Sequence, residues 1–305
     1  MTAANPVYTP RREAQSEWLD VRGLRLHVRR WKNEGAPQLF LIHGWMDASA
    51  SFQFLVDALA AEWDVIALDL RGFGESEWDE SGYFFAQYLA DLDALLEHYS
   101  PNAPARLVGH SLGGNIVCVY AGVRPQRVAA LANLDAFGLR DAAPEEAPLR
   151  LEKWLAELRA PQKHRTHPDT SSLITQLRFE NPRLSRERAA FIATHLGEDD
   201  GLGNIVRAAD PAHKHVSPVL YRFPEIVAAW RRIAAPVLIV RAADDAVAKR
   251  VGVTEDEIRQ RFECFPHARV ETLEDSGHNL HLEQPERLAA LLEAFFASSA
   301  HSPTR

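Results

Sequence analysis

The sequence predicts an α/β protein in which a mostly parallel sheet is covered by helices on both faces. Two observations support this class. Short apolar runs at residues 38–42, 65–68 and 106–108 alternate with helical patterns, and such alternation is typical of parallel strands buried on both faces. The alternation then stops for a long stretch and returns at residues 236–240 and 269–273.

The first part of the chain follows this pattern element by element. Residues 18–21 and 24–31 flank Arg22-Gly23, which is typical of an antiparallel hairpin with a glycine turn. Apolar side chains at helical spacing then alternate with buried strands. The remaining elements expected before residue 137 are helices at 52–61, 83–99 and 115–123 and a strand at 128–134.

Residues 138–234 differ from the rest because they are charged and helix-patterned, without a clear strand. The two strands that follow supply what a sheet begun in the first part still lacks. We therefore expect one α/β core, formed by 1–137 and 235–305, with a helical cap inserted at 138–234, rather than a separate C-terminal domain. The expected cap helices lie at 149–158, 173–179 and 186–196.

Composition excludes several classes of partner. The 305 residues include 34 Lys and Arg against 42 Asp and Glu, a net charge of -8, and no Lys/Arg-rich run offers a phosphate-binding stripe for nucleic acid. Cys118 and Cys264 are too few for a disulfide scaffold. Residues 1–17 have no apolar leader, and no run approaches the roughly 18 apolar residues of a membrane span. We expect a cytoplasmic protein with a small-molecule partner.

One motif suggests nucleophilic chemistry. Gly109-His110-Ser111-Leu112-Gly113 lies between a strand pattern and a helix pattern, the setting that gives Gly-x-Ser-x-Gly its meaning. A serine on so tight a turn adopts a strained backbone, and glycines on either side remove the Cβ atoms that would collide. The sequence therefore predicts that Ser111 projects its hydroxyl beside the first amides of a helix.

A carboxylate and a histidine follow the last two strands. Asp244 and Asp245 come after residues 236–240, and His278 comes after 269–273. A serine needs an imidazole to take its proton, and a buried carboxylate fixes the tautomer of that imidazole. Asp245 fits the acid best by position, with Asp244 and then Asp135, after the preceding strand, as alternatives. His278, next to Gly277, is favoured as the base over His281.

The oxyanion formed in such chemistry needs preorganised amides. The sequence predicts the amide of Leu112, directly after the serine, and the amide of Trp45, after His43-Gly44. Because only the amides act, both side chains are free to shape the pocket.

These motifs together resemble the α/β-hydrolase superfamily over nearly the whole chain outside the cap. The resemblance implies Ser111 as nucleophile, Asp245 as acid and His278 as base. It departs at Ala242, where the acid motif usually has glycine. Residues 43–47 and 207–211 resemble the serine hydrolase-like proteins of that superfamily. The matching segments are Leu41-Ile42-His43-Gly44-Trp45, Asp69-Leu70-Arg71-Gly72-Phe73-Gly74-Glu75-Ser76, Gly109 to Gly114 and Gly277 to Glu286.

Other polar residues in these motifs are expected to be structural. His110 should pack beside the serine turn, and His43 should order the oxyanion loop. Asp69 and Arg71 are interpreted as a turn network. The pair His213 and His215 lacks the carboxylate or cysteine partners of a metal site, so we expect it on the cap surface.

The leading functional hypothesis is a carboxylesterase for small or medium acyl esters, working through a Ser111 acyl-enzyme without metal or cofactor. A thioesterase, a lactonase or a hydrolase of carbon–carbon bonds would use the same groups. The last is less favoured, because His110 and Trp45 stand where those enzymes more often carry asparagine. Relatives that attack through an aspartate are excluded by Ser111. A ligand-binding protein on the same scaffold is the alternative of another class.

Overall fold

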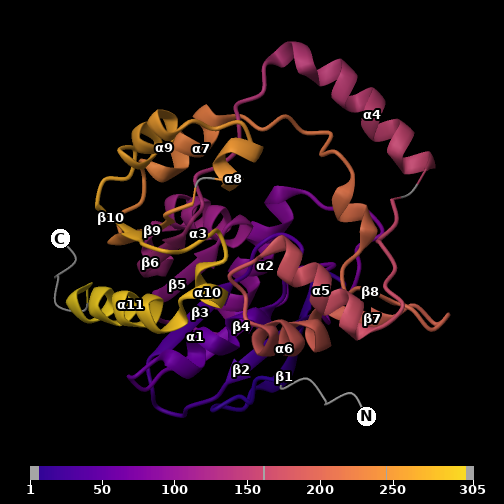
Figure 1. Ribbon diagram of the computed structural model, residues 1–305. Coiled ribbons are helices and arrows are strands. Elements are labelled where there is room, and N and C mark those ends of the chain that lie inside the picture. Colours follow the sequence, from indigo (N-terminus) through magenta and orange to yellow (C-terminus); the bar gives the residue numbers. More distant parts are fainter. Residues whose placement is uncertain (1–6, 161, 245, 300–305) are drawn as a thin grey trace.

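The computed structural model describes residues 7–160, 162–244 and 246–299 (Figure 1). Within these residues a sheet of eight strands has the order β1-β2-β4-β3-β5-β6-β9-β10. β2 is antiparallel to both of its neighbours, and the other adjacent strands pair in parallel, so the predicted α/β class is confirmed. The strands are β1 (Gln15–Val21), β2 (Leu24–Trp31), β3 (Gln38–Ile42), β4 (Asp64–Leu68), β5 (Ala105–His110), β6 (Val128–Leu134), β9 (Val237–Ala242) and β10 (Ala268–Leu273).

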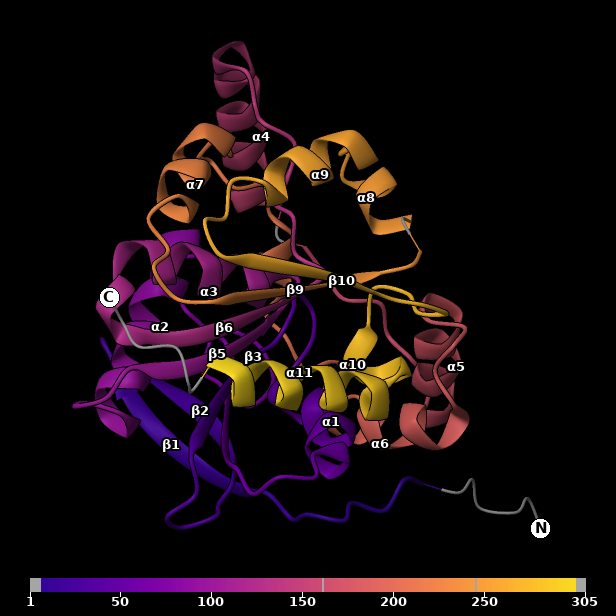
Figure 2. The same cartoon turned by 90° about the vertical axis from the view of Figure 1, so that its left-hand side faces the viewer.

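Helices cover both faces of this sheet (Figure 2). One face carries α2, α3, α7 and α9, and the other carries α1, α10 and α11. The helices are α1 (Gln53–Ala58), α2 (Phe85–Tyr99), α3 (Leu112–Val123), α4 (Ala147–Arg159), α5 (Thr170–Glu180), α6 (Arg186–Leu196), α7 (Phe223–Trp230), α8 (Ala246–Arg250), α9 (Glu255–Phe262), α10 (Leu280–Glu283) and α11 (Pro285–Ser299). Short 3-10 turns lie at Ser49–Phe52, Pro125–Arg127, Pro144–Glu146 and Pro211–Lys214.

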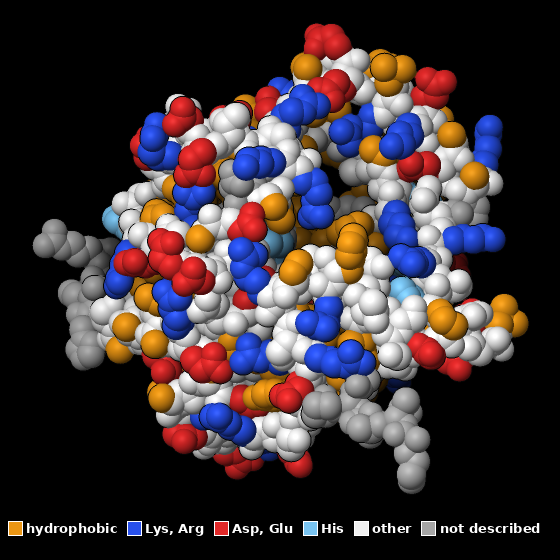
Figure 3. Space-filling view, in the orientation of Figure 1, with side chains coloured by type: hydrophobic (Ala, Val, Ile, Leu, Met, Phe, Trp, Pro, Cys, Tyr) orange, Lys and Arg blue, Asp and Glu red, His pale blue; other side chains and the backbone are white. Residues whose placement is uncertain are grey.

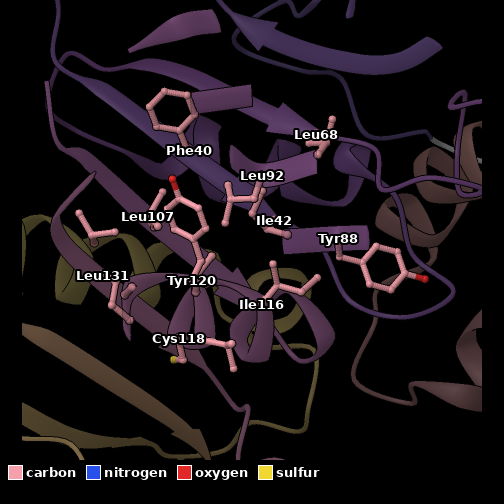
Figure 4. Packing of buried hydrophobic residues seen from close by; sticks show 14 of the residues in the cluster. Phe40, Ile42, Leu68, Tyr88, Leu92, Leu107, Ile116, Cys118, Tyr120 and Leu131 are labelled. Carbon is pink, nitrogen blue, oxygen red and sulfur yellow. The ribbon is translucent and has the colours of Figure 1, made fainter. Parts of the chain in front are cut away.

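The alternation of side chains along β3 shows why its sequence is apolar throughout. Phe40 and Ile42 point into the core beneath α2 and α3, where Figure 4 shows them packed with Tyr120 and its neighbours. Leu39 and Leu41 point to the opposite core, beneath α1 and α11. Since successive strand residues face opposite sides, a strand covered on both faces needs apolar residues at every position.

The segment between β6 and β9 contains α4, α5 and α6, as the helical pattern predicts, and we call residues 138–234 the cap. The expectation that it lacks strands is wrong. β7 (Gly197–Asp199) pairs antiparallel with β8 (Ile205–Arg207). Each strand has three residues, which is too short for a period-two pattern to be detected.

The cap helices pack in different ways. α5 and α6 enclose a small core of their own, with Leu173, Phe191 and Leu196 buried against Phe54 of the main domain. α4 extends away from the body (Figure 1) and buries none of its side chains. α7 packs on the sheet, and its Trp230 is fully buried in the main core.

A small contact joins the cap to the core. The ring of His213 stacks between Phe73 and Tyr83, with centroid distances of 3.7 and 3.6 Å. The Tyr83 hydroxyl donates to Asp210 at 2.7 Å. The prediction that His213 lies on the cap surface is therefore wrong: it is wedged into the joint, and burial lowers its pKa to about 3. His215 is half-buried.

Candidate active site

Ser111 occupies the turn between β5 and α3 with a strained backbone. Its φ and ψ are 53° and -113°, a combination that costs a non-glycine residue about 1–3 kcal/mol. Glycines permit the turn, because a Cβ on Gly109 would strike the Gly113 carbonyl and one on Gly113 would strike the carbonyl of Ile42. The strand, the helix and both glycines thus hold the serine hydroxyl at the carboxyl edge of the sheet.

Two side chains follow Ser111 in a hydrogen-bonded row. The Oγ of Ser111 is 2.9 Å from Nε2 of His278. Nδ1 of His278 is 2.7 Å from Oδ2 of Asp135, and the other oxygen of Asp135 accepts the Ala242 amide at 3.0 Å. Because a carboxylate can only accept, Nδ1 carries a proton, and in the neutral ring Nε2 is then the nitrogen that accepts from the Ser111 hydroxyl.

Asp135 is the last of the three candidate acids that the sequence offers. The first choice, Asp245, lies outside the described residues. Asp244 is half-exposed and accepts hydrogen bonds from the Ala246 amide at 2.9 Å and Arg183 at 3.3 Å. Asp135 follows β6, which lies between β5 and β9 in the sheet, and is buried. Both β6 and β9 end at the same sheet edge, so residue spacing along the chain cannot distinguish their carboxylates.

The predicted oxyanion loop follows β3. A Cβ on Gly44 would lie 3.2 Å from the Cβ of Ser111, so the loop backbone runs directly beside the serine. Within the described part of the chain, the amides of Trp45 and Leu112 have no hydrogen-bond acceptor. Both N–H groups therefore remain unpaired within this part of the chain, and the Trp45 side chain is half-exposed.

His43 is buried and orders this loop, as expected. Its Nδ1 donates to the Gly44 carbonyl at 2.7 Å, and its Nε2 accepts the Leu70 amide at 2.9 Å. With both ring nitrogens in use, His43 has no free lone pair for a substrate proton.

The other two histidines of the motifs, His110 and His281, have different partners. Nε2 of His110 donates to the backbone carbonyl of His278 at 2.8 Å, and burial lowers the pKa of His110 well below its ordinary value. His281, on α10, contacts Ser51 at 3.1 Å and Asp47 at 3.5 Å. The structure therefore brings His278, and not His281, to Ser111.

Asp69 and Arg71 form the expected turn network away from the serine. Asp69 accepts from His27 at 2.7 Å and from the Ser49 amide at 2.6 Å. Burial alone would raise the pKa of Asp69, but these hydrogen bonds bring it well below the ordinary value. Arg71 binds both oxygens of Asp91.

Two arginines of the cap lie near the loops that carry the predicted oxyanion amide of Trp45 and the side chain of His278. Arg207 donates to the Met46 carbonyl at 3.3 Å and pairs with Glu180 at 3.0 Å. Arg183 approaches Gly277, next to His278. Figure 3 shows this face hollowed below α4, with apolar, Lys and Arg side chains at its rim.

The fold agrees with comparisons to known proteins. A family model described as alpha/beta hydrolase fold matches residues 37–285. Since the match covers most of the chain, the protein belongs to this family.

Individual relatives are distant. A serine hydrolase-like protein of Danio rerio is 22% identical over 97% of this chain and 92% of its own length. A 3-hydroxybutyrate-oligomer hydrolase of Cupriavidus necator is 27% identical over 89% of this chain and 92% of its own. Among solved structures, the thioesterase domain from the curacin biosynthetic pathway superposes with a TM-score of 0.84 at 22% identity, covering 92% of this chain and 99% of that one.

The residues described here include no helix that is both long and apolar enough to span a membrane.

Proposed function

We propose that this protein is a serine hydrolase that cleaves carboxylic esters of small or medium acyl chains. The observation that carries the proposal is the row from Ser111 Oγ to His278 Nε2 at 2.9 Å and from His278 Nδ1 to Asp135 at 2.7 Å. This row gives a nucleophile, a base with the correct tautomer, and a buried acid.

In the proposed reaction His278 takes the proton of Ser111 while Oγ attacks the ester carbonyl. The carbonyl π electrons move onto oxygen, where the amides of Trp45 and Leu112 stabilise the charge. The C–O bond to the alcohol then breaks, and His278 delivers its proton to the departing oxygen. Water, deprotonated by the same histidine, attacks the acyl-enzyme and releases the acid and Ser111.

Asp135 is proposed as the acid in place of Asp245. The carboxylate stabilises the imidazolium that forms when His278 takes a proton, and it remains ionised throughout. The Ala242 amide, which binds its second oxygen, keeps this carboxylate oriented toward Nδ1.

Relatives support the proposal at the level of reaction class. The Cupriavidus necator relative is named as an oligomer hydrolase, and the curacin domain is named as a thioesterase. Both reactions are acyl transfers to water. The test must therefore separate esters from thioesters and lactones.

The experiment measures hydrolysis of a panel of p-nitrophenyl esters of increasing acyl length, with matched thioesters and lactones. We expect ester turnover with a preference for short or medium chains, and a loss of about 10³-fold or more in Ser111→Ala. Ser217→Ala, at an exposed serine of the cap, serves as the matched control. Equal turnover by Ser111→Ala and the wild type would refute the assignment, and faster turnover of thioesters would change the substrate class.

A further inference from the structure

A second group of polar side chains lies next to His278, whose backbone carbonyl accepts a hydrogen bond from one of them. Asp47 follows the oxyanion loop, His110 ends β5, and His281 lies on α10. One ligand atom from each side chain lies within 4.8 Å of the other two. We call these three residues the histidine cluster.

The histidine cluster contains buried nitrogens without partners. Nε2 of His110 is occupied by the His278 carbonyl, so its Nδ1 carries a lone pair. Among the described residues neither this Nδ1 nor the Nδ1 of His281 has a hydrogen-bond partner, although the two residues are 2% and 0% exposed. Buried polar atoms in proteins are nearly always paired, so an unpaired one calls for an explanation, and an ion on Nδ1 of His110 would supply one.

One pair of these side chains has the spacing of zinc ligands. Oδ2 of Asp47 and Nε2 of His281 are 3.5 Å apart, and two ligands about 2.0–2.1 Å from a tetrahedral zinc ion are about 3.4 Å apart. Because the Ser51 hydroxyl donates to Asp47, Nε2 of His281 donates its proton to Ser51 at 3.1 Å, and a bound ion would displace that proton. Ser51 donates to the same oxygen of Asp47 at 2.8 Å, which orients the carboxylate as outer hydrogen bonds do in metal sites. Two imidazoles and one carboxylate leave a fourth position for water.

Charge and access also favour an ion here. Asp47 supplies a negative charge, and its side chain is 14% exposed, so the cluster is not wholly closed off from solvent.

We propose that the histidine cluster binds a divalent transition metal ion such as Zn²⁺. The ligands would be a carboxylate oxygen of Asp47, Nε2 of His281 and Nδ1 of His110. The rings of His110 and His278 are 4.8 Å apart, so this site lies next to the proposed active site but is distinct from it.

Binding is measured first, because it does not depend on activity. Metal-free protein is titrated with ZnCl₂ by calorimetry, and the stoichiometry is checked by elemental analysis after dialysis. We expect about one zinc ion per chain, with affinity about 100-fold weaker in Asp47→Asn and in His281→Gln. His98→Gln and His267→Gln, at exposed histidines, are the matched controls and should bind as the wild type does.

Two further measurements identify the ligands. Replacing zinc with Co²⁺ should give the intense visible bands of a tetrahedral site in the wild type and not in Asp47→Asn, which changes only one atom of a partly exposed side chain. His278→Gln should still bind zinc, because His278 is not a ligand. Absence of zinc binding, or binding that is unchanged in both cluster variants, would overturn the site. Binding lost in His278→Gln would assign the ion to the proposed active site instead.

Discussion

His278 and His281 are three residues apart in one motif, yet they lie in different environments. His278 is partly exposed and bonds Ser111 and Asp135, both at the carboxyl edge of the sheet. His281 is fully buried and contacts Ser51 and Asp47.

This difference shows that the partners of a histidine decide its chemistry. In the proposed mechanism His278 has a serine on one nitrogen and a carboxylate on the other, so it can hold and release a proton. His281 faces a hydroxyl and a carboxylate through one nitrogen, without a partner for the other among the described residues. It has no contact with Ser111, so we expect it to act on structure or on a bound ion.

The largest effect separates the two histidines directly. His278→Gln should lower kcat/KM for esters by about 10⁴-fold or more, because no other group can take the serine proton. His281→Gln should lower the free energy of unfolding by about 1–3 kcal/mol through lost buried hydrogen bonds, with a much smaller effect on the rate. Ester kinetics and urea unfolding check both. An equal loss of rate in the two variants would break the comparison.

The next effect concerns the acid. Asp135→Asn should lower kcat by about 10⁴-fold, because an amide beside Nδ1 favours the wrong tautomer. Asp244→Asn is the matched control and should keep nearly the full rate. Asp245→Asn tests the sequence-based prediction. Steady-state kinetics at one pH decide the question, and a larger loss in Asp245→Asn than in Asp135→Asn would assign the acid to Asp245.

A smaller effect concerns pH and stability at the joint between cap and core. The pKa of His213 is about 3 in the folded protein, lowered by burial, and about 6.5 when unfolded. Its contribution to stability is complete above pH 6.5 and falls as the pH drops toward 3, because the unfolded state binds the proton first. The loss should reach about 2 kcal/mol at pH 5. Urea unfolding from pH 7 to pH 5 measures it, and His213→Gln should flatten the dependence. An equal slope in both proteins would contradict this assignment.

The smallest effect concerns the same joint. Tyr83→Phe removes the hydrogen bond to Asp210 and should lower the free energy of unfolding by about 1 kcal/mol. Tyr221→Phe is a matched control, because the hydroxyl of Tyr221 has no hydrogen-bond partner among the described residues. Thermal unfolding of both variants checks the prediction, which fails if the two shifts are equal.

The sequence predicted the sheet and the serine turn because both depend on local patterns. Apolar runs such as residues 38–42 specify buried strands, and only glycine fits at positions 109 and 113. His278 was distinguished from His281 by its neighbour Gly277, whose amide bonds Glu283 at 2.6 Å and shapes that loop.

The parts that were missed depend on contacts between distant segments. The hydrogen bond between Asp135 and His278 joins residues far apart along the chain, so no local pattern indicates it. Ala242, in place of the usual glycine, is a local departure from the acid motif of the family. The position of His213 could not be predicted from the sequence. Its stacking partners, Phe73 and Tyr83, belong to the core, and no local pattern in the cap indicates that contact.

The most direct test of the proposed Ser111–His278–Asp135 row is labelling with a fluorophosphonate, followed by intact mass and peptide mapping. Wild type, Asp135→Asn and Asp244→Asn are compared. We predict a single adduct on Ser111, formed at similar rates in wild type and Asp244→Asn and far more slowly in Asp135→Asn. No adduct on the folded wild type, an adduct on another serine, or equal labelling of Asp135→Asn would contradict the account.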